Sequence, residues 1–385
     1  MPMILANANV LTETGLEPRN IAIEEGRIAG LTAAGGAGAW DLRGAMVLPA
    51  IVDIHGDAFE RQLQPRPGVD FPPDLALAET ERQLLANGIT TAFHGVTFSW
   101  EPGLRGLEAW RALLAALERG RFACDMRVHL RWEAYNVDAA AEAAAAIRAG
   151  RVHLLAYNDH TPSIVRKLDD ATSTAKLAER AGMKVEAFRD IALAAAARAP
   201  EVEAARRVVT EAAREAGIPM ASHDDETVTE REQFRALGAA ICEFPVTEAV
   251  AVAASEAGEA VVMGAPNVVR GGSHIGWASA ADMARRGLCT VLASDYYYPC
   301  LLEAPFRLAA DGMALAEAWA LVAANPARAA HLTDRGLIAA GKRADLLVVT
   351  VENGHPRLLA TIVAGRIAWL APGIEAPARA MPAAA

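Results

Sequence analysis

Three imidazoles and three carboxylates are the residues of this sequence best suited to chemistry. His55 and Asp57 are separated by one residue, so a strand directs both side chains to the same face. Imidazole nitrogens and carboxylate oxygens bind Zn²⁺, Mn²⁺ or Fe²⁺, and water held by such ions is a hydrolytic nucleophile. We predict two divalent ions per chain and expect Asp295 also to be catalytic, by taking the proton of this water. The predicted metal ligands are His55, Asp57, Glu133, His160, His223 and Asp295.

These residues stand at or near the C-terminal ends of apolar runs that predict strands. Eight such runs alternate with alanine-rich helical segments, which is typical of βα units. Eight units predict an α/β fold of the TIM (β/α)8 barrel type, whose catalytic groups converge at the C-terminal ends of its strands. A doubly wound open sheet has the same alternation but spreads such groups along a crevice. The runs cover residues 48–57, 89–96, 127–136, 152–160, 219–225, 239–246, 260–267 and 289–297.

The other histidines and the neighbouring aspartates are interpreted as structural groups. His129 and His153 come early in their strands, and His331 and His355 fall outside the barrel strands. His94 ends the second run, and the sequence leaves its role open. Three aspartates beside the predicted ligand histidines would orient ligands or cap turns: Asp159, Asp224 and Asp225.

Both ends of the chain alternate apolar and polar residues in the manner of strands. The tetrapeptide Gly-Arg-Ile-Ala occurs near each end, at 26–29 and 365–368. We therefore expect the two ends to build one small β-sandwich domain. The predicted organisation is a composite β domain of residues 1–48 and 342–372, a metal-dependent barrel of residues 49–341 and a flexible tail of residues 373–385.

The composition limits the classes of function. The net charge of −10 argues against broad binding to nucleic acid or anionic membranes, because both need basic surfaces. No apolar run approaches the roughly 20 residues of a membrane helix, and no basic segment precedes the first apolar residues as in a signal peptide. The four cysteines form no C-x-x-C pair, which favours free thiols and a cytoplasmic location. An alanine-rich barrel exterior is consistent with a homodimer.

Four further residues are predicted to bind a small anionic substrate: Arg61, Arg66, Arg270 and His274. Arg66 lies between two prolines, which make its segment rigid. In "RGGSH", residues 270–274, an arginine precedes two glycines whose backbone N–H groups are open to an anion. Solvated surface charges would explain the arginines equally well.

The motifs also resemble a known family. "LPAIVDIHGD", "GITTAF" and "NPARAAHLTDRGLIAAGKRADLLVV" resemble the amidohydrolase superfamily. More narrowly, "DIHGDAFERQLQPRPGVDFP", "VHLRWE", "ASHDDET", "VMGAPNVVRGGSH" and "LASDYYYPCLL" resemble the PhnM-type diphosphatases of phosphonate metabolism. The resemblance implies cleavage of α-D-ribose 1-methylphosphonate 5-triphosphate to the 5-phosphate and pyrophosphate, and it carries the metal-ligand roles to the six residues. The segment "TPSIVRKLDDATST" after His160 departs from this pattern.

Two other functions remain open at this point. An amidohydrolase or deaminase that opens C–N bonds of a small cyclic substrate would use the same metal-bound hydroxide. A non-catalytic, metal-bound scaffold subunit would share the fold, because fold does not fix function. The arginines discriminate, since a neutral heterocycle does not need guanidinium groups beside the metals.

Overall fold

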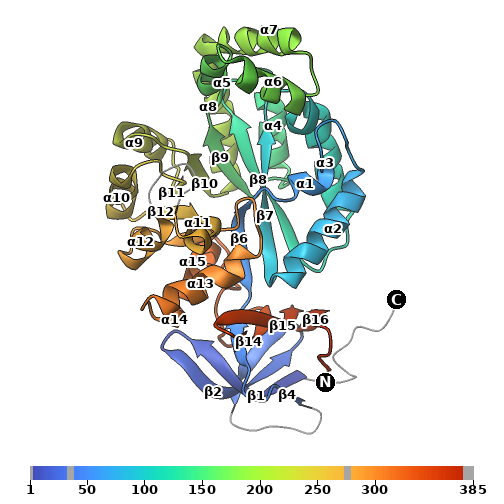
Figure 1. Cartoon of the computed structure of the whole chain (residues 1–385), viewed down its shortest axis with the longest axis vertical. Coiled ribbons are helices and arrows are strands. Elements are labelled where there is room, and N and C mark those ends of the chain that lie inside the picture. The colour runs from blue at the N-terminus through green and yellow to red at the C-terminus, as the bar shows by residue number, and fades with distance from the viewer. Residues whose placement is uncertain (1–2, 33–38, 273–278, 376–385) are drawn as a thin grey trace.

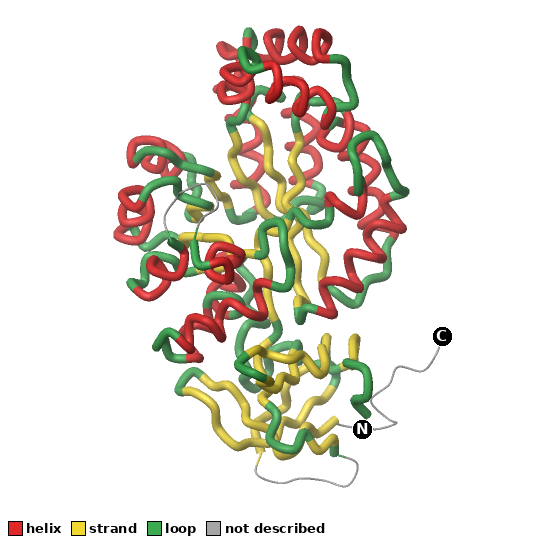
Figure 2. Tube along the Cα trace, viewed as in Figure 1, coloured by secondary structure: helices red, strands yellow, loops and turns green. Residues whose placement is uncertain are grey.

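The computed structural model describes residues 3–32, 39–272 and 279–375, which form a barrel and a smaller sheet along the long axis of the molecule (Figure 1). Most of the predicted C-terminal tail, residues 376–385, lies outside the described residues. Figure 2 shows helices around the barrel strands, whereas the described part of the smaller sheet consists of strands and loops.

Eight parallel strands form the barrel, and neighbours in sequence are neighbours in space. They are β6 (Ile51–Gly56), β7 (Ile89–Phe98), β8 (Asp125–Glu133), β9 (Leu154–Asn158), β10 (Met220–His223), β11 (Ile241–Glu243), β12 (Ala260–Gly264) and β13 (Val291–Ala293). A parallel bridge between Gly56 and Asp295 brings the last strand back to the first. The barrel is thus nearly closed, and the predicted TIM-type fold is confirmed.

The barrel interior is apolar and filled by side chains such as Ile54, Phe93, Leu154 and Val262. Each fully buried side chain of this size contributes on the order of 2 kcal/mol to folding. The helices around it are α2 (Pro73–Ala86), α3 (Leu107–Arg119), α4 (Ala140–Arg148), α8 (Ala199–Ala216), α9 (Val228–Ala236), α10 (Glu248–Glu256), α11 (Ala265–Arg270), α12 (Ala280–Arg285), α13 (Cys300–Ala310), α14 (Leu315–Ala320) and α15 (Ala324–Ala329).

Helix α9 illustrates how local sequence sets a helix boundary. Thr227 Oγ1 accepts a hydrogen bond from the Glu230 backbone N–H, and Glu230 Oε2 accepts one from the Thr227 N–H. This reciprocal capping box fixes the start of the helix. Gly238 follows its end with a φ of 96°, a conformation that glycine adopts at low cost.

Short elements cover the C-terminal ends of the barrel strands. They are α1 (Glu60–Leu63), the 3₁₀ turns η1 (Gly103–Arg105) and η2 (Val137–Ala139), and helices α5 (Thr161–Lys167), α6 (Ala171–Arg180) and α7 (Val185–Ala196). Helices α5 to α7 pack together on an apolar cluster that includes Ile164 and Phe188. They lie at the top of Figure 1, directly after β9 in the chain.

Both chain ends build the smaller sheet, in the order β16-β15-β14-β5-β1-β2-β3 with β4 paired to β1. Its strands are β1 (Met3–Thr12), β2 (Gly15–Glu24), β3 (Arg27–Thr32), β4 (Trp40–Asp41), β5 (Met46–Pro49), β14 (Leu346–Glu352), β15 (His355–Val363) and β16 (Arg366–Leu370). The two Gly-Arg-Ile-Ala repeats begin at hairpin turns that touch, because a Cβ on Gly365 would lie 3.2 Å from Gly26 Cα. The expected composite sheet is confirmed, while its exact boundaries stay a prediction.

None of the described helices is long and apolar enough to cross a membrane. All four cysteines are buried and unpaired, as the sequence predicts.

Candidate metal centre

The buried part of the centre contains His55 at the end of β6, His223 at the end of β10 and Glu243 at the end of β11. Glu243 Oε2 lies 3.1 Å from His55 Nδ1 and 3.4 Å from His223 Nδ1. One ligand atom from each residue falls within 4.8 Å of the others, close enough to share a metal ion. We did not predict Glu243 from the sequence, although it ends a barrel strand as several predicted ligands do.

Burial strongly shifts the pKa values of the residues in this first group. It raises the pKa of the Glu243 carboxyl to about 7 and lowers the pKa of His55 to about 3. The pKa of His223 falls well below its usual value because of burial and the charge of Arg131. Neutral imidazole is the form that binds a metal, so this environment keeps both histidines ready to act as ligands.

His129, which we expected early in its strand, lies against this group. Its ring centroid is 4.8 Å from that of His55, and its Nε2 is 3.6 Å from Glu243 Oε2. His129 Nδ1 donates a hydrogen bond to the Ile54 carbonyl at 2.9 Å, which fixes the orientation of the ring. β8 begins at Asp125, so His129 stands in its middle and shares one face with Glu133.

A second group lies nearer the solvent and contains His160, His223 and Asp224. His160 Nε2 is 3.7 Å and His223 Nε2 is 3.6 Å from Asp224 Oδ2. His223 therefore belongs to both groups, as expected of a residue between two adjacent ion sites. Asp224, which we interpreted as an orienting or capping residue, is a candidate ligand.

Glu133 holds His160 in place. Its carboxylate lies 2.5 Å from His160 Nδ1 and accepts a hydrogen bond from the His160 backbone N–H at 3.1 Å. Burial lowers the pKa of His160, but the hydrogen bonds to Asp224 and Glu133 raise it to about 9 on balance. Glu133, which we predicted to be a metal ligand, therefore lies beside the second group and contacts one of its members.

Asp57 and Asp295 meet at the junction of the first and last strands. The Asp57 N–H donates to the Asp295 carbonyl at 2.9 Å, and the Asp295 N–H donates to the His55 carbonyl at 3.0 Å. Burial, and then the charge of Asp57, raise the pKa of Asp295 to about 7. Asp57, Glu133 and Asp295 are members of neither three-residue group.

Backbone strain marks two aspartates of the mouth. Asp224 has a φ of 59° and Asp295 a φ of 55°, in the left-handed region that costs a non-glycine residue about 1 kcal/mol. Asp224 directly follows β10, and Asp295 follows β13 after one intervening residue, Ser294. Strain at these two strand ends is a feature of functional sites.

Arg131 crosses the space between these groups. Its Nη2 donates to His223 Nε2 at 2.8 Å, and its Nη1 lies 3.6 Å from Asp57 Oδ2. We did not predict Arg131 from the sequence, although it precedes Glu133 by two residues and so shares its face of β8.

The donor set fits divalent cations. His129 Nε2 and Glu243 Oε1 are buried and have no hydrogen-bond partner. Leaving such an atom unsatisfied costs about 1–3 kcal/mol, which coordination to a cation would remove. His94 is different: both of its nitrogens are buried and unsatisfied, but its ring lies 4.8 Å from that of Phe59 and it belongs to neither group.

The predicted substrate-binding residues do not all come together. Arg61 and Arg66 line one cavity beside the mouth. Arg270, on α11, is exposed and lies within hydrogen-bond distance of the Tyr296 hydroxyl, at 3.4 Å. His274 lies outside the described residues.

A nearly closed (β/α)8 barrel with imidazoles and carboxylates at its mouth, flanked by a sheet from both chain ends, defines an amidohydrolase-type hydrolase. The model of the amidohydrolase family matches residues 46–368, and the chain belongs to this family. More particularly, it is 32% identical over 367 residues to the alpha-D-ribose 1-methylphosphonate 5-triphosphate diphosphatase of Escherichia coli K12. The aligned region covers 92% of this chain and 96% of that protein.

Solved structures support the fold. The 5-methylcytosine deaminase of Klebsiella pneumoniae has a TM-score of 0.61 at 16% identity and covers 97% of this chain and 98% of its own. The dihydropyrimidinase of Brevibacillus agri has a TM-score of 0.58 at 13% identity and covers 95% of both chains. At these identities the likeness concerns the fold alone.

Proposed function

We propose that this protein is a metal-dependent diphosphatase that hydrolyses α-D-ribose 1-methylphosphonate 5-triphosphate to the 5-phosphate and pyrophosphate. The observation that carries the proposal is the 32% identity to the Escherichia coli diphosphatase over 96% of that protein. The family membership, shown by the match over residues 46–368, supports hydrolysis as the reaction class.

Two ions such as Zn²⁺, Mn²⁺ or Fe²⁺ would be held by the predicted ligands together with Glu243 and Asp224. When bound, such ions lower the pKa of a water and neutralise phosphoryl oxygens. In the proposed site Glu133 orients His160, and Arg131 supplies positive charge between His223 and Asp57.

The reaction adds one water across a phosphoanhydride bond. The oxygen of water joins the phosphorus that stays on the ribose, and the P–O bond to the departing diphosphate breaks. The Asp295 carboxylate takes a proton from the attacking water, as its place beside His55 and Asp57 allows. Arginine side chains at the mouth offset the charge that develops on the leaving diphosphate.

The test is ³¹P NMR of metal-reconstituted protein with the ribose triphosphate. We expect pyrophosphate release from the wild type, its loss in Asp295→Asn and full activity in Asp190→Asn, because Asp190 is an exposed residue of α7. An intact triphosphate in the presence of bound metal would contradict the proposal. Amides and deaminase substrates would then be tested, and inactivity on all of them would favour the scaffold role.

A further inference from the structure

A cavity of about 210 Å³ lies beside the barrel mouth, between α1, the segment 64–67, η1 and the end of α6. These elements follow β6, β7 and β9, so the cavity is built on the C-terminal side of the barrel. Six charged side chains line it: Arg61, Arg66, Arg105, Arg180, Glu60 and Glu101.

The cavity carries an excess of positive charge. Glu101 is buried and pairs with Arg180 at 2.5 Å, while Glu60 pairs more loosely with Arg105 at 3.7 Å. Four arginines face two glutamates, which leaves two positive charges without a carboxylate. Arg180 Nε is buried and has no hydrogen-bond partner, so this guanidinium has a donor available inside the protein.

The charge of Arg105 is favoured by carboxylates of both this cavity and the candidate metal centre. Burial lowers its pKa, but the carboxylates of Glu60, Glu101, Glu133 and Asp57 raise it on balance. The first two line the cavity, and the last two are predicted metal ligands.

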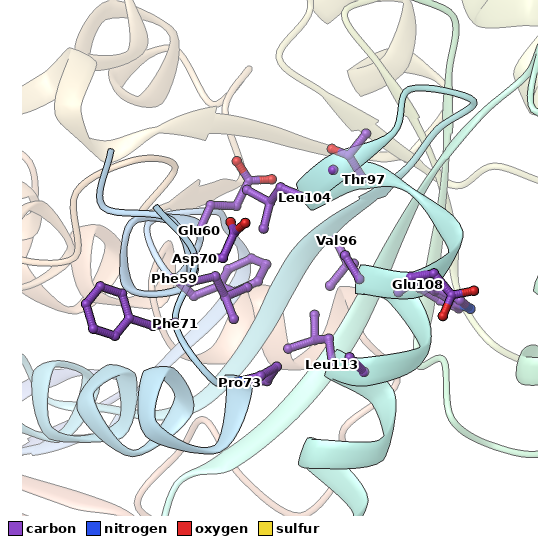
Figure 3. A pocket seen from close by; sticks show the side chains of 15 residues that line it. Phe59, Glu60, Asp70, Phe71, Pro73, Val96, Thr97, Leu104, Glu108 and Leu113 are labelled. Atoms are coloured by element: carbon purple, nitrogen blue, oxygen red, sulfur yellow. The ribbon is translucent and has the colours of Figure 1, made fainter. Parts of the chain in front are cut away.

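The neighbouring cavity, of about 310 Å³, has the opposite character (Figure 3). It shares Glu60 with the arginine-lined cavity, but apolar side chains such as Phe59, Val96 and Leu113 line it. Its other carboxylates are Asp70 and Glu108. A polyanion would be repelled there, which leaves the arginine-lined cavity as the compatible one of the two.

We infer that the arginine-lined cavity binds the terminal diphosphate of a triphosphate substrate, with Arg66 and Arg180 as specificity-determining residues. The inference rests on the proposed diphosphatase function. Guanidinium groups suit this role because they bind phosphate oxygens through two parallel N–H groups. Arg180 comes from α6, so the helices inserted after β9 take part in substrate selection.

Isothermal titration of inorganic pyrophosphate and tripolyphosphate into the chelator-treated full chain tests the cavity without catalysis. We expect Arg66→Gln and Arg180→Gln each to weaken binding about tenfold, in line with loss of a charge-assisted hydrogen bond. Arg166→Gln, on the exposed face of α5, is the matched control and should change binding less than twofold.

Arg180→Gln leaves Glu101 buried without its partner, so Glu101→Gln with Arg180→Gln is the second variant. It removes both charges, and it should show the same weakened binding with a wild-type circular dichroism spectrum. Absence of polyphosphate binding to the wild type, or equal binding by all variants, overturns the inference.

Turnover of the ribose triphosphate separates this inference from the proposed function. If polyphosphate binding depends on Arg66 and Arg180 but the ribose triphosphate is not hydrolysed, the cavity assignment stands and the diphosphatase proposal fails. If hydrolysis occurs with an unchanged KM in both variants, the diphosphatase proposal stands and the cavity assignment fails.

Discussion

Two buried arginines at opposite ends of the barrel have different surroundings. At the N-terminal end of the strands, Arg335 donates to Thr91 Oγ1 and Asp125 Oδ2, each at 2.7 Å, and to Asp334 at 2.8 Å. At the C-terminal end, Arg131 donates to His223 at 2.8 Å, but its Nε is buried without a partner. The N-terminal arginine is well paired, whereas the C-terminal one is only partly satisfied.

The carboxylates at the two ends follow the same division. Burial raises the pKa of Asp125, but hydrogen bonds and the charges of Arg127 and Arg335 lower it overall. Burial raises the pKa of Glu243 to about 7, and nearby cations offset this only in part. The paired groups at the N-terminal end stabilise the folded chain. The unsatisfied groups at the mouth lower its stability but remain able to bind a ligand.

The largest effect is expected from His223→Ala, because His223 belongs to both three-residue groups. Hydrolysis should fall on the order of 10⁴-fold, as when residues that act as a unit are broken, and bound metal should fall with it. Initial rates and elemental analysis of the purified protein measure both. His355→Ala, an exposed histidine paired with Glu303, is the control. Full metal content with normal turnover would show that His223 is not a shared ligand.

At the other end, Arg335→Met should reduce stability and leave catalysis intact. Removing one partner of a buried ion pair costs about 3–5 kcal/mol, because Asp125 is left without its counter-charge. Urea unfolding measures the loss, and kcat of the folded protein should stay within twofold. Arg328→Met changes an exposed arginine of α15 and should leave unfolding unchanged. A large loss of kcat with unchanged stability would show that Arg335 serves catalysis and not stability, against the role assigned to the N-terminal end.

Glu243→Gln should increase the stability of the folded chain, whereas Arg335→Met should decrease it. The substitution keeps the shape of a fully buried side chain and removes its charge. Burying a carboxylate charge that is imperfectly paired destabilises the folded chain. In chelator-treated protein, we expect a gain of about 1–3 kcal/mol in the free energy of unfolding. The metal-loaded variant should lose about 10–100-fold in activity, as when groups around a metal are altered. A loss of stability in the chelated variant would mean that Glu243 is a structural residue.

The fold was accessible from sequence where the signal is local. Apolar runs with polar ends predict the barrel strands, and Thr227 with Glu230 predicts the start of α9. Helices α5 to α7 were not predicted, because their positions depend on packing contacts such as that of Phe188 within their own cluster. The sequence carries their helical composition but not their place above the barrel.

The site was accessible in part for a similar reason. Position at a strand end predicted His55 and His223. Glu243 was not predicted because β11 has only three residues. In such a short strand the glutamate lies within an apolar run and does not stand out as its end. His129 and Arg131 share the inward face of β8 with Glu133, so alternation along that strand could have predicted both. Which of these groups meet depends on barrel closure, which brings distant strands together.

The smallest effect is expected at His153, which precedes β9 at the N-terminal end of the barrel. Its Nδ1 accepts a hydrogen bond from the Val128 N–H at 3.2 Å, which favours the neutral ring. Burial, and then the charge of Arg127, lower its pKa from 6.5 to about 4. Between these pH values the unfolded chain binds a proton that the folded chain does not, so stability falls as the pH drops from 6.5 to 4.

His153→Gln should remove on the order of 1–2 kcal/mol of this acid sensitivity, after allowance for partial exposure. Urea unfolding of chelator-treated wild type and variant at pH 7.5 and pH 5 measures the difference, with His355→Gln as the exposed control. If His153→Gln flattens the profile, the otherwise well-paired end of the barrel contains a proton-sensitive position of its own. An unchanged profile would assign the acid sensitivity to the buried histidines of the mouth, and the division between the two ends would be sharper.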